Sequence, residues 1–420
     1  MRAAARWLAC CALLLAALVR GAHAAPAEPV LAHFPQPGLT AEQLGVIVND
    51  DDPDSVAIAA YYMAKRGIPA ANLIHVRFRP GRAALGRAEF DAIKRAVDAA
   101  TPDTVEAYAL TWAQPYRVDC MSITSAFALG FDPDYCADGC KPTRPSPYFD
   151  SRATRPYATH GVRPTMSLAA ASVDAARALI DRGVAADGSN PAGTAYLVRT
   201  QDRSRSVRAA AYAETKHRLH AIHPVAIVDT EALAGRRDVM FYFTGRTHVA
   251  ELASNTFLPG ALGDHLTSAG GHLFGGSQMS SLAWLEAGAT GSYGTVVEPC
   301  AFPAKFPVPA IVMAHYLQGE TLVEAYWKSV QMPGQGLFIG EPLARPFAGV
   351  VTRATADGEL RIGARLLAPG LYAVEAASSP VGPYRPVARV PVQWGMRELA
   401  LRGLAPAYYR FERVAPAARR

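Results

Sequence analysis

The segment VMFYFTGRTHV, residues 239–249, contains the pattern on which the fold prediction rests. Five apolar residues are followed by a Thr-Gly pair and then by Arg246, Thr247 and His248. A short apolar run that ends in glycine and polar residues is typical of a buried strand in a parallel sheet. The segment therefore predicts a strand that delivers polar side chains to a sheet edge, where ligands commonly bind.

Strand-like and helix-like segments alternate on both sides of this strand. Strands that alternate with helices of ten or more residues predict right-handed crossovers and a mainly parallel sheet covered by helices on both faces. The predicted fold class is therefore α/β. The predicted strands are 44–50, 68–78, 105–112, 193–200, 224–230, 238–245, 270–276 and 290–299, and the predicted helices are 55–67, 87–100, 167–183, 206–222, 280–289 and 309–319.

Composition and pattern also predict how the chain is divided. The chain has 420 residues, of which 50% are hydrophobic and 19% charged, so it is long enough for a large core and a second domain. Its last part contains short strands separated by Gly and Pro, with no helix pattern. The predicted regions are a signal peptide (1–24), a linker (25–43), an α/β domain (44–347) with an irregular Cys-containing insertion (112–165), and a small β-sandwich-like module (348–416).

The first 24 residues have the pattern of a secretory signal. Arg2 and Arg6 precede an apolar run from Leu8 to Val19, and Ala22-His23-Ala24 supplies a small-residue cleavage site. The run is shorter than the roughly 20 residues of a membrane-spanning helix. We expect cleavage after Ala24, an exported chain in the periplasm or outside the cell, and no transmembrane segment after cleavage; the alternative is an uncleaved anchor.

The charge balance argues against one class of partner. Removing the three arginines of the signal lowers the formal net charge from +6 to +3, and the remaining arginines are scattered. A nucleic-acid-binding protein would concentrate its basic residues in a patch or stripe. The sequence therefore predicts no nucleic-acid partner, and no pattern in it predicts a cofactor or a metal.

Four cysteines remain after the signal is removed: Cys120, Cys136, Cys140 and Cys300. An exported chain meets conditions that permit disulfides, so two bridges are predicted. The CADGC segment has a spacer that could close a small Cys136–Cys140 loop and leave Cys120 to pair with Cys300. A zinc site with further ligands and a free nucleophilic thiol remain as alternatives.

Several segments resemble known families. The strand ending in FTG, followed by GGSQMSS, AGATGSYGTVVEP, GETLVEAYWKSV and FIGEPLARPF, resembles the order of motifs in gingipain-type cysteine peptidases, which have the caspase-like fold. This resemblance covers about 225–347. The mature chain also resembles a serially numbered family of hypothetical secreted bacterial proteins, in VIVNDDDPDSVAIAAYYMAKRGIP, RPTMSLAA, LIDRGVAADG, YLVRTQDRSRSVRA and WLEAGATGSYGTVVEP.

The peptidase resemblance implies a His-Gly motif after one strand and a Ser-Cys motif after the next. Here Arg246 stands at the His position and Gln278, after Ser277, at the Cys position. Arginine stays protonated and cannot act as a base, and glutamine is no nucleophile. The dyad is therefore absent, unless His248 acts as the base for Ser277; Cys300 follows one strand too late to be the nucleophile.

Polar residues that follow predicted strands are the candidate ligand-binding groups. Thr200, Asp202 and Arg203 stand at a strand-to-helix junction, where amides and guanidinium groups can hold a carboxylate or phosphate; the alternative is internal salt bridging. The acids of DDDPDS, 50–55, are compatible with a bound Ca²⁺ or with a helix cap. The full candidate set is Asn49, Arg117, Arg163, Thr200, Asp202, Arg203, Arg246 and Glu298, with Glu298 expected to pair with Arg246.

Three functions are compatible with these patterns. The leading hypothesis is a degenerate peptidase-like protein, not an active cysteine peptidase, that binds an anionic or peptide-like ligand in an Arg-lined crevice. The second is a secreted hydrolase that uses Ser277 and His248, with Arg246 as an electrophilic stabiliser. The third is a structural surface protein that works through its β module.

Overall fold

The computed structural model describes residues 32–33, 38–137, 139–348, 352–354, 359–363, 367, 369–378, 383–394, 396, 398–402 and 408–414. The predicted signal peptide lies outside these residues. The helices are α1 (Pro53–Arg66), α2 (Arg87–Ala100), α3 (Ile123–Leu129), α4 (Pro156–His160), α5 (Val173–Ala186), α6 (Tyr212–Leu219), α7 (Leu282–Glu286), α8 (Pro309–Leu317) and α9 (Leu322–Ser329). Among these residues no helix has the length and apolarity that a bilayer crossing requires.

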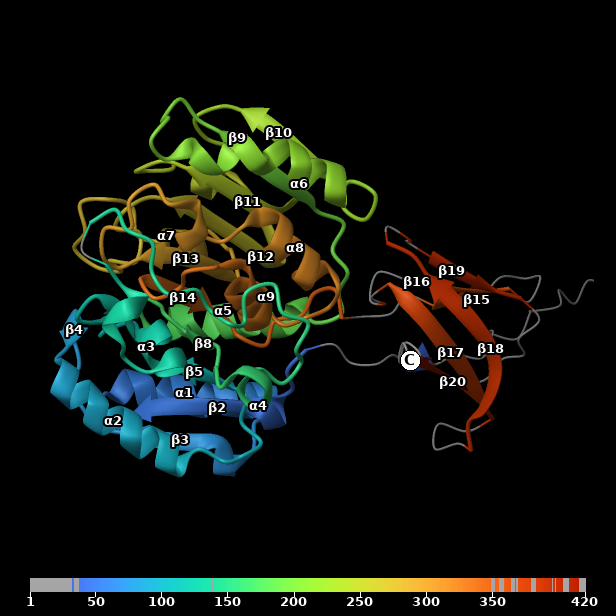
Figure 1. Cartoon of the computed structure of the whole chain (residues 1–420), viewed down its shortest axis with the longest axis horizontal. Helices are drawn as coiled ribbons and strands as arrows, with labels where there is room; N and C mark the ends of the chain where they lie inside the picture. The colour runs from blue at the N-terminus through green and yellow to red at the C-terminus, as the bar shows by residue number, and fades with distance from the viewer. Residues whose placement is uncertain are drawn as a thin grey trace, which may run out of the picture.

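The strands of the α/β part form one large sheet. They are β2 (Leu44–Asn49), β3 (Leu73–Val76), β5 (Ala107–Leu110), β8 (Thr165–Ser167), β9 (Thr194–Arg199), β10 (Val225–Asp229), β11 (Val239–Gly245), β12 (Phe257–Leu266), β13 (Gly291–Thr295) and β14 (Gly336–Gly340). Their order is β10-β9-β11-β12-β13-β14-β8-β5-β2-β3 (Figure 1). A small separate sheet holds β4 (Ala84–Leu85), β6 (Arg117–Val118) and β7 (Met121–Ser122).

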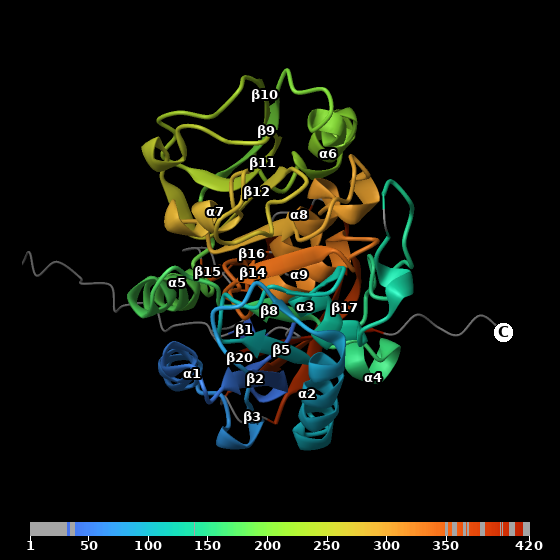
Figure 2. The ribbon, with the colours of Figure 1, turned by 90° about the vertical axis from the view of Figure 1, so that its left-hand side faces the viewer.

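The large sheet is mostly parallel, which confirms the predicted fold class. Neighbours from β10 to β13 and from β8 to β3 are parallel, while β14 is antiparallel to β13 and meets β8 at a single residue pair. Figure 2 shows α1, α5 and α7 on one side of the sheet and α2, α3, α6 and α8 on the other. Since both faces are covered, the central strands are buried throughout.

The helix predicted at 55–67 shows how local sequence determines an element. Asp52 caps α1 by accepting a hydrogen bond from the Asp54 amide at 3.1 Å, and Pro53 occupies the first turn. Gly67 ends the helix in the left-handed conformation, with φ of 62°. The DDDPDS segment therefore supplies the helix cap.

The strand predicted at 270–276 is wrong. A different strand, β12, lies next to β11, so different residues stand beside the rim of β11. Residues 270–276 form a loop of turns and bends, whereas β12 (Phe257–Leu266) lies beside β11, with Gly245 opposite Leu266. The sequence of β12 contains one proline, two glycines and Asp264, which interrupt the apolar pattern. Asp264 is tolerated inside because it forms a buried ion pair with Arg208 at 2.6 Å between Nη2 and Oδ1.

Other boundaries also differ from the prediction. The insertion predicted to be irregular, 112–165, contains α3, α4 and the strands β6 and β7. The helix predicted at 167–183 begins only at Val173, because its first residue belongs to β8. The helix predicted at 206–222 starts as a 3-10 helix, η4 (Ser206–Ala211), and continues as α6.

Two disulfides form, as predicted, but the expected pairing is wrong. Cys120 pairs with Cys136, and Cys140 pairs with Cys300. Cys120 lies in the turn between β6 and β7. After α3 the chain comes back to this turn, and the Cα atoms of Cys120 and Cys136 are 5.8 Å apart. Cys140 is then left to join the insertion to the loop after β13.

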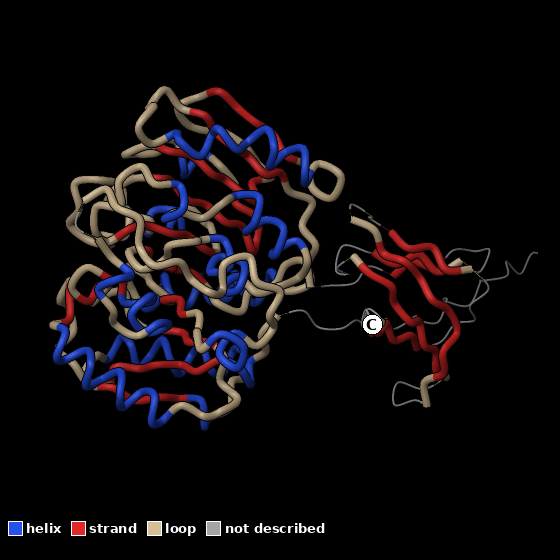
Figure 3. Tube along the Cα trace, in the orientation of Figure 1, coloured by secondary structure: helices blue, strands red, loops and turns tan. Residues whose placement is uncertain are grey.

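The C-terminal strands form two small sheets, as expected for an all-β module (Figures 1 and 3). One sheet has the order β1-β20-β17-β18 and the other β15-β16-β19. Part of the predicted linker belongs to the first, because β1 pairs with β20. The bounds are β1 (Ala32–His33), β15 (Thr352–Ala354), β16 (Leu360–Gly363), β17 (Gly370–Ala377), β18 (Arg385–Val392), β19 (Glu398–Leu401) and β20 (Tyr408–Arg413).

The end of the predicted linker also packs against the α/β part. Leu39 is buried, and its amide donates to Glu324 Oε2 at 2.9 Å, beside the first turn of α9. Arg66 at the end of α1 contacts Glu341, whose amide donates to Thr290 at the start of β13. The amino ends of β2 and β13 therefore lie at one edge of the sheet, and the carboxyl ends at the other.

Candidate functional site

The carboxyl ends of β9, β10 and β11 meet at an open pocket of about 320 Å³, which we call the rim pocket. It is lined by Asp202, Glu231, Arg246, Thr247 and His248. Three of these residues follow β11, the strand from which the prediction began. The predicted polar rim is therefore present at this edge, and Glu231, which the sequence analysis missed, belongs to it.

Arg246 forms an ion pair with Glu231, not with Glu298 as predicted. The Glu231 carboxylate is also fixed by the Gln201 amide, which donates to Oε1 at 2.8 Å. Glu298 follows β13 and accepts from the Cys300 amide at 2.7 Å. Because β12 lies between β11 and β13, the two strands are about 10 Å apart, which places Glu298 beyond the rim pocket.

The residues that follow β9 mainly organise the rim. Asp202 accepts hydrogen bonds from the amide and Nη1 of Arg205, both at 3.1 Å, at the start of η4. Thr200 donates from its hydroxyl to the Gly245 carbonyl at 2.7 Å and so joins β9 to β11. Arg203 is exposed and has no hydrogen bond or ion pair to any described residue. Of this predicted group, only Asp202 lines the pocket.

Gly245 is required by a close backbone contact. A Cβ atom at this position would lie 1.9 Å from the carbonyl oxygen of Arg205 and 2.8 Å from the amide nitrogen of Ser206. No side chain fits there unless η4 moves. The glycine of FTG therefore allows the first turn of η4 to sit directly on the end of β11.

The structure does not join His248 and Ser277 into a catalytic pair. Both side chains are exposed, and neither forms a hydrogen bond with any described residue. Gln278 instead binds the end of β12: its Oε1 accepts from the Thr267 hydroxyl at 2.7 Å and from the Ala269 amide at 2.8 Å. At the predicted Cys position, Gln278 thus holds the 270–278 loop in place.

The corrected strand order reveals Ser268, which the sequence analysis missed. It is the second residue after β12, is half-buried, and its hydroxyl has no hydrogen-bond partner among the described residues. The nearby His265 is not available as a base, because Nε2 bonds the Met279 carbonyl at 3.1 Å and Nδ1 accepts from Trp284 at 2.9 Å. Burial lowers the pKa of His265 to about 3. Ser268 could have been found only by predicting β12, because it is then one of the polar residues that follow a strand.

Three of the predicted ligand residues do not line the rim pocket: Asn49, Arg163 and Arg117. Asn49 holds β2 to the chain after β3, with hydrogen bonds to the Phe78 amide and carbonyl at 3.1 and 2.9 Å. Six strands separate β2 from β9, so Asn49 is about 34 Å from Thr200. Arg163 precedes β8, at the opposite edge of the sheet, where it donates to Val105 and stacks on Tyr157.

Arg117 belongs to β6 in the separate three-stranded sheet and does not line the rim pocket. Of the arginines predicted to line one crevice, only Arg246 contributes to this pocket. The physical reason is topology: Arg163 precedes its strand instead of following it, and Arg117 belongs to the separate sheet, so neither stands at the carboxyl ends of β9, β10 and β11. The predicted Arg-lined crevice is therefore a pocket of mixed charge.

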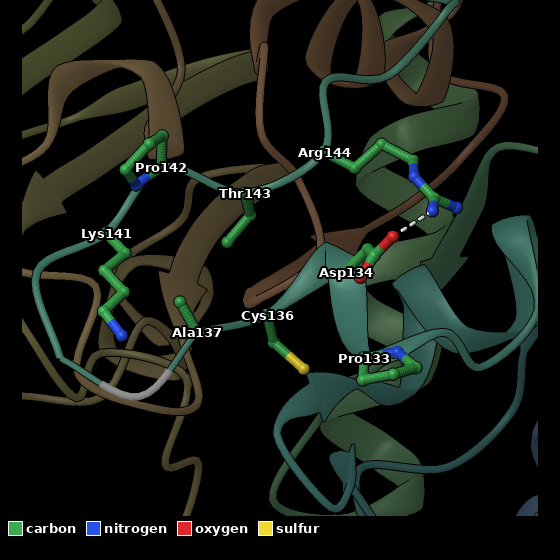
Figure 4. A pocket seen from close by; sticks show the side chains of 8 residues that line it. All are labelled: Pro133, Asp134, Cys136, Ala137, Lys141, Pro142, Thr143 and Arg144. Atoms are coloured by element: carbon green, nitrogen blue, oxygen red, sulfur yellow. Dashed lines mark hydrogen bonds and ion pairs between the residues drawn. The ribbon is translucent and has the colours of Figure 1, made fainter.

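A second open pocket, of about 490 Å³, lies on the disulfide-linked insertion (Figure 4). Arg144 on its border forms ion pairs with Asp132 and Asp134, so its charge is neutralised locally. The lining residues are Pro133, Asp134, Cys136, Ala137, Lys141, Pro142, Thr143 and Arg144.

Comparisons with known proteins give structural similarities only. The chain matches no family model and no curated protein sequence. A complex of the pro- and mature domains of RgpB from Porphyromonas gingivalis has a TM-score of 0.46 and 8% identity, covering 85% of this chain and 92% of that chain. A structure described as a protease has a TM-score of 0.41 and 10% identity, covering 90% and 98%. The functional proposal therefore comes from this chain's own residues.

Proposed function

We propose that this chain is an exported protein that binds a small anionic or peptide-like ligand in the rim pocket and does not act as a cysteine peptidase. The observation that carries the proposal is the rim pocket itself, where polar groups from three adjacent strand ends converge. Binding needs only such convergent donors and acceptors. The two disulfides are consistent with export.

The cysteines support the non-catalytic part of the proposal. Cysteine-peptidase chemistry requires a thiolate with an imidazole near it. Cys120, Cys136, Cys140 and Cys300 are all consumed in disulfides, so the described residues offer no free thiol. The exposed His248 has no hydroxyl partner among them. A hydrolytic reaction of this type thus lacks both the nucleophile and its activation.

The groups around the rim pocket favour a small anion. Arg246 and His248 line it together with Glu231, which pairs with Arg246, and Arg203 follows Asp202 in the chain with no ion pair to any described residue. Asp202 is already neutralised by Arg205, so it contributes little repulsion toward an incoming anion. A volume of about 320 Å³ is at the lower end of the roughly 300–1,000 Å³ of small-molecule pockets. The ligand is therefore of dipeptide or tripeptide size.

A thermal-shift screen with the mature chain tests this proposal, using small carboxylates and short peptides as probes. A ligand at about 100 times its Kd adds about 2.7 kcal/mol to the free energy of unfolding, and Arg246→Gln is expected to remove that gain. Arg177→Gln is the matched control, because Arg177 is an exposed arginine on α5 paired with Asp174. It should leave binding unchanged.

The same samples, followed by mass spectrometry, separate the three functions. Unchanged peptides together with Arg246-dependent stabilisation support binding. Cleavage that disappears in His248→Ala would instead support the hydrolase. Absence of stabilisation by every probe, with no cleavage, would refute the proposed function and leave the structural surface protein.

A further inference from the structure

A carboxylate already occupies the anion-binding position on Arg246. Glu231 follows β10 and reaches the guanidinium group of Arg246, which follows β11. The Gln201 amide, after β9, donates to the other oxygen of the same carboxylate at 2.8 Å. One carboxylate thus receives a guanidinium and a backbone amide from two strand ends, which is the arrangement used for a bound carboxylate ligand.

We propose that Glu231 is an internal competitor and that the ligand of the rim pocket carries a free carboxylate, as the C-terminus of a short peptide does. This inference rests on the proposed function of the same pocket. When the ligand binds, its carboxylate takes the place of Glu231 on Arg246. The side chain of Glu231 then turns to solvent, and Gln201 is free to donate to the ligand.

Because the ion pair is partly exposed, replacing Glu231 by a ligand carboxylate costs little free energy. The side chains of Arg246 and Glu231 are 37% and 46% exposed, and pairs of such exposure contribute little to stability because water screens both charges. A buried pair, such as Arg208 and Asp264 at 2% and 1% exposure, would resist exchange. The ion pair at the rim can therefore open without disturbing the core.

The other groups of the pocket fit a single carboxylate. Asp202 is held by Arg205 and does not compete for Arg246. Thr247 and His248 lie beside Arg246 and offer further donors to a second oxygen. The guanidinium is planar and binds a carboxylate through two parallel hydrogen bonds, which a neutral amide cannot reproduce. Recognition is therefore expected to depend on the negative charge of the ligand terminus.

Isothermal titration calorimetry with two matched peptides tests the proposal. The probes are N-acetyl-trialanine with a free C-terminal carboxylate and the same peptide with a C-terminal amide. We expect the wild-type chain to bind the acid at least about ten-fold more tightly than the amide. Glu231→Gln should bind the acid about two- to five-fold more tightly than wild type, because the competing charge is gone.

The variants are chosen to keep the loop intact. A glutamine at position 231 can still accept the hydrogen bond from the Gln201 amide, so the loop geometry is retained. Arg246→Gln should lose the preference for the acid, and in that background Glu231→Gln should bring no gain. Circular dichroism and the melting temperature verify that each variant is folded.

Each outcome has one meaning. If acid and amide bind equally while Arg246→Gln weakens both, the pocket binds peptides but the carboxylate inference is wrong. If Glu231→Gln weakens binding of the acid, Glu231 is a ligand contact and not a competitor. If neither peptide binds, or if only inorganic phosphate in a parallel titration does, the carboxylate inference is refuted; failure of all anions would refute the proposed function as well.

Discussion

Removing the Cys140–Cys300 disulfide should destabilise the fold more than removing the Cys120–Cys136 disulfide. The two bridges have sequence separations of 160 and 16 residues. In the chain-entropy model, a bridge stabilises by restricting the unfolded chain, and the effect grows with the logarithm of loop length. The long loop gives about 5 kcal/mol and the short loop about 3 kcal/mol, so the two losses should differ by about 2 kcal/mol.

Two double variants measure these losses: Cys140→Ser with Cys300→Ser, and Cys120→Ser with Cys136→Ser. Replacing both partners leaves no free thiol to form a new bridge. Urea denaturation followed by tryptophan fluorescence gives the free energy of unfolding, and peptide mapping without reduction identifies the bridges in the wild-type chain. Equal losses in the two variants would contradict the loop-length argument, and a mapped Cys136–Cys140 bridge would contradict the pairing.

Two further changes test packing and charge. His315 is buried between Asp150 (3.0 Å) and Glu320 (3.1 Å); burial alone would lower its pKa, but these hydrogen bonds hold the pKa above its ordinary value. The resulting stability is present at pH below about 6.5 and is lost as pH rises through the folded-state pKa, so His315→Gln should cost about 1.5–3 kcal/mol at pH 6 and less at pH 9. A cost that is the same at both pH values in urea unfolding would refute the charged role. Gly245→Ala places a Cβ 1.9 Å from a backbone oxygen and should cost at least about 1–3 kcal/mol, whereas at Gly270 the nearest atom is 3.4 Å away and the cost should be below 1 kcal/mol. Melting temperatures of the two variants that fall equally would contradict the close contact.

Local sequence patterns were sufficient to predict those helices and strands whose apolar spacing lies within the element itself. The helix α2 covers the predicted residues 87–100, because its buried residues Phe90, Ile93 and Val97 recur at helical spacing within the segment itself. The strand β11 likewise has the predicted course. By contrast, β12 was missed because Asp264 inside it is compensated by Arg208, a residue more than 50 positions away in the chain. An ion pair between residues so far apart in the chain gives no periodic pattern in the sequence around Asp264.

The candidate site shows the same division. The sequence by itself determined the alternation that makes a mainly parallel sheet, the polar rim after β11, and the formation of two disulfides. Only the tertiary structure decided which of these groups meet: Arg246 with Glu231, Gln278 with Thr267, and Cys140 with Cys300. The physical reason is that periodicity and capping act over a few residues, whereas ion pairs and bridges depend on strand order, which results from packing the whole core.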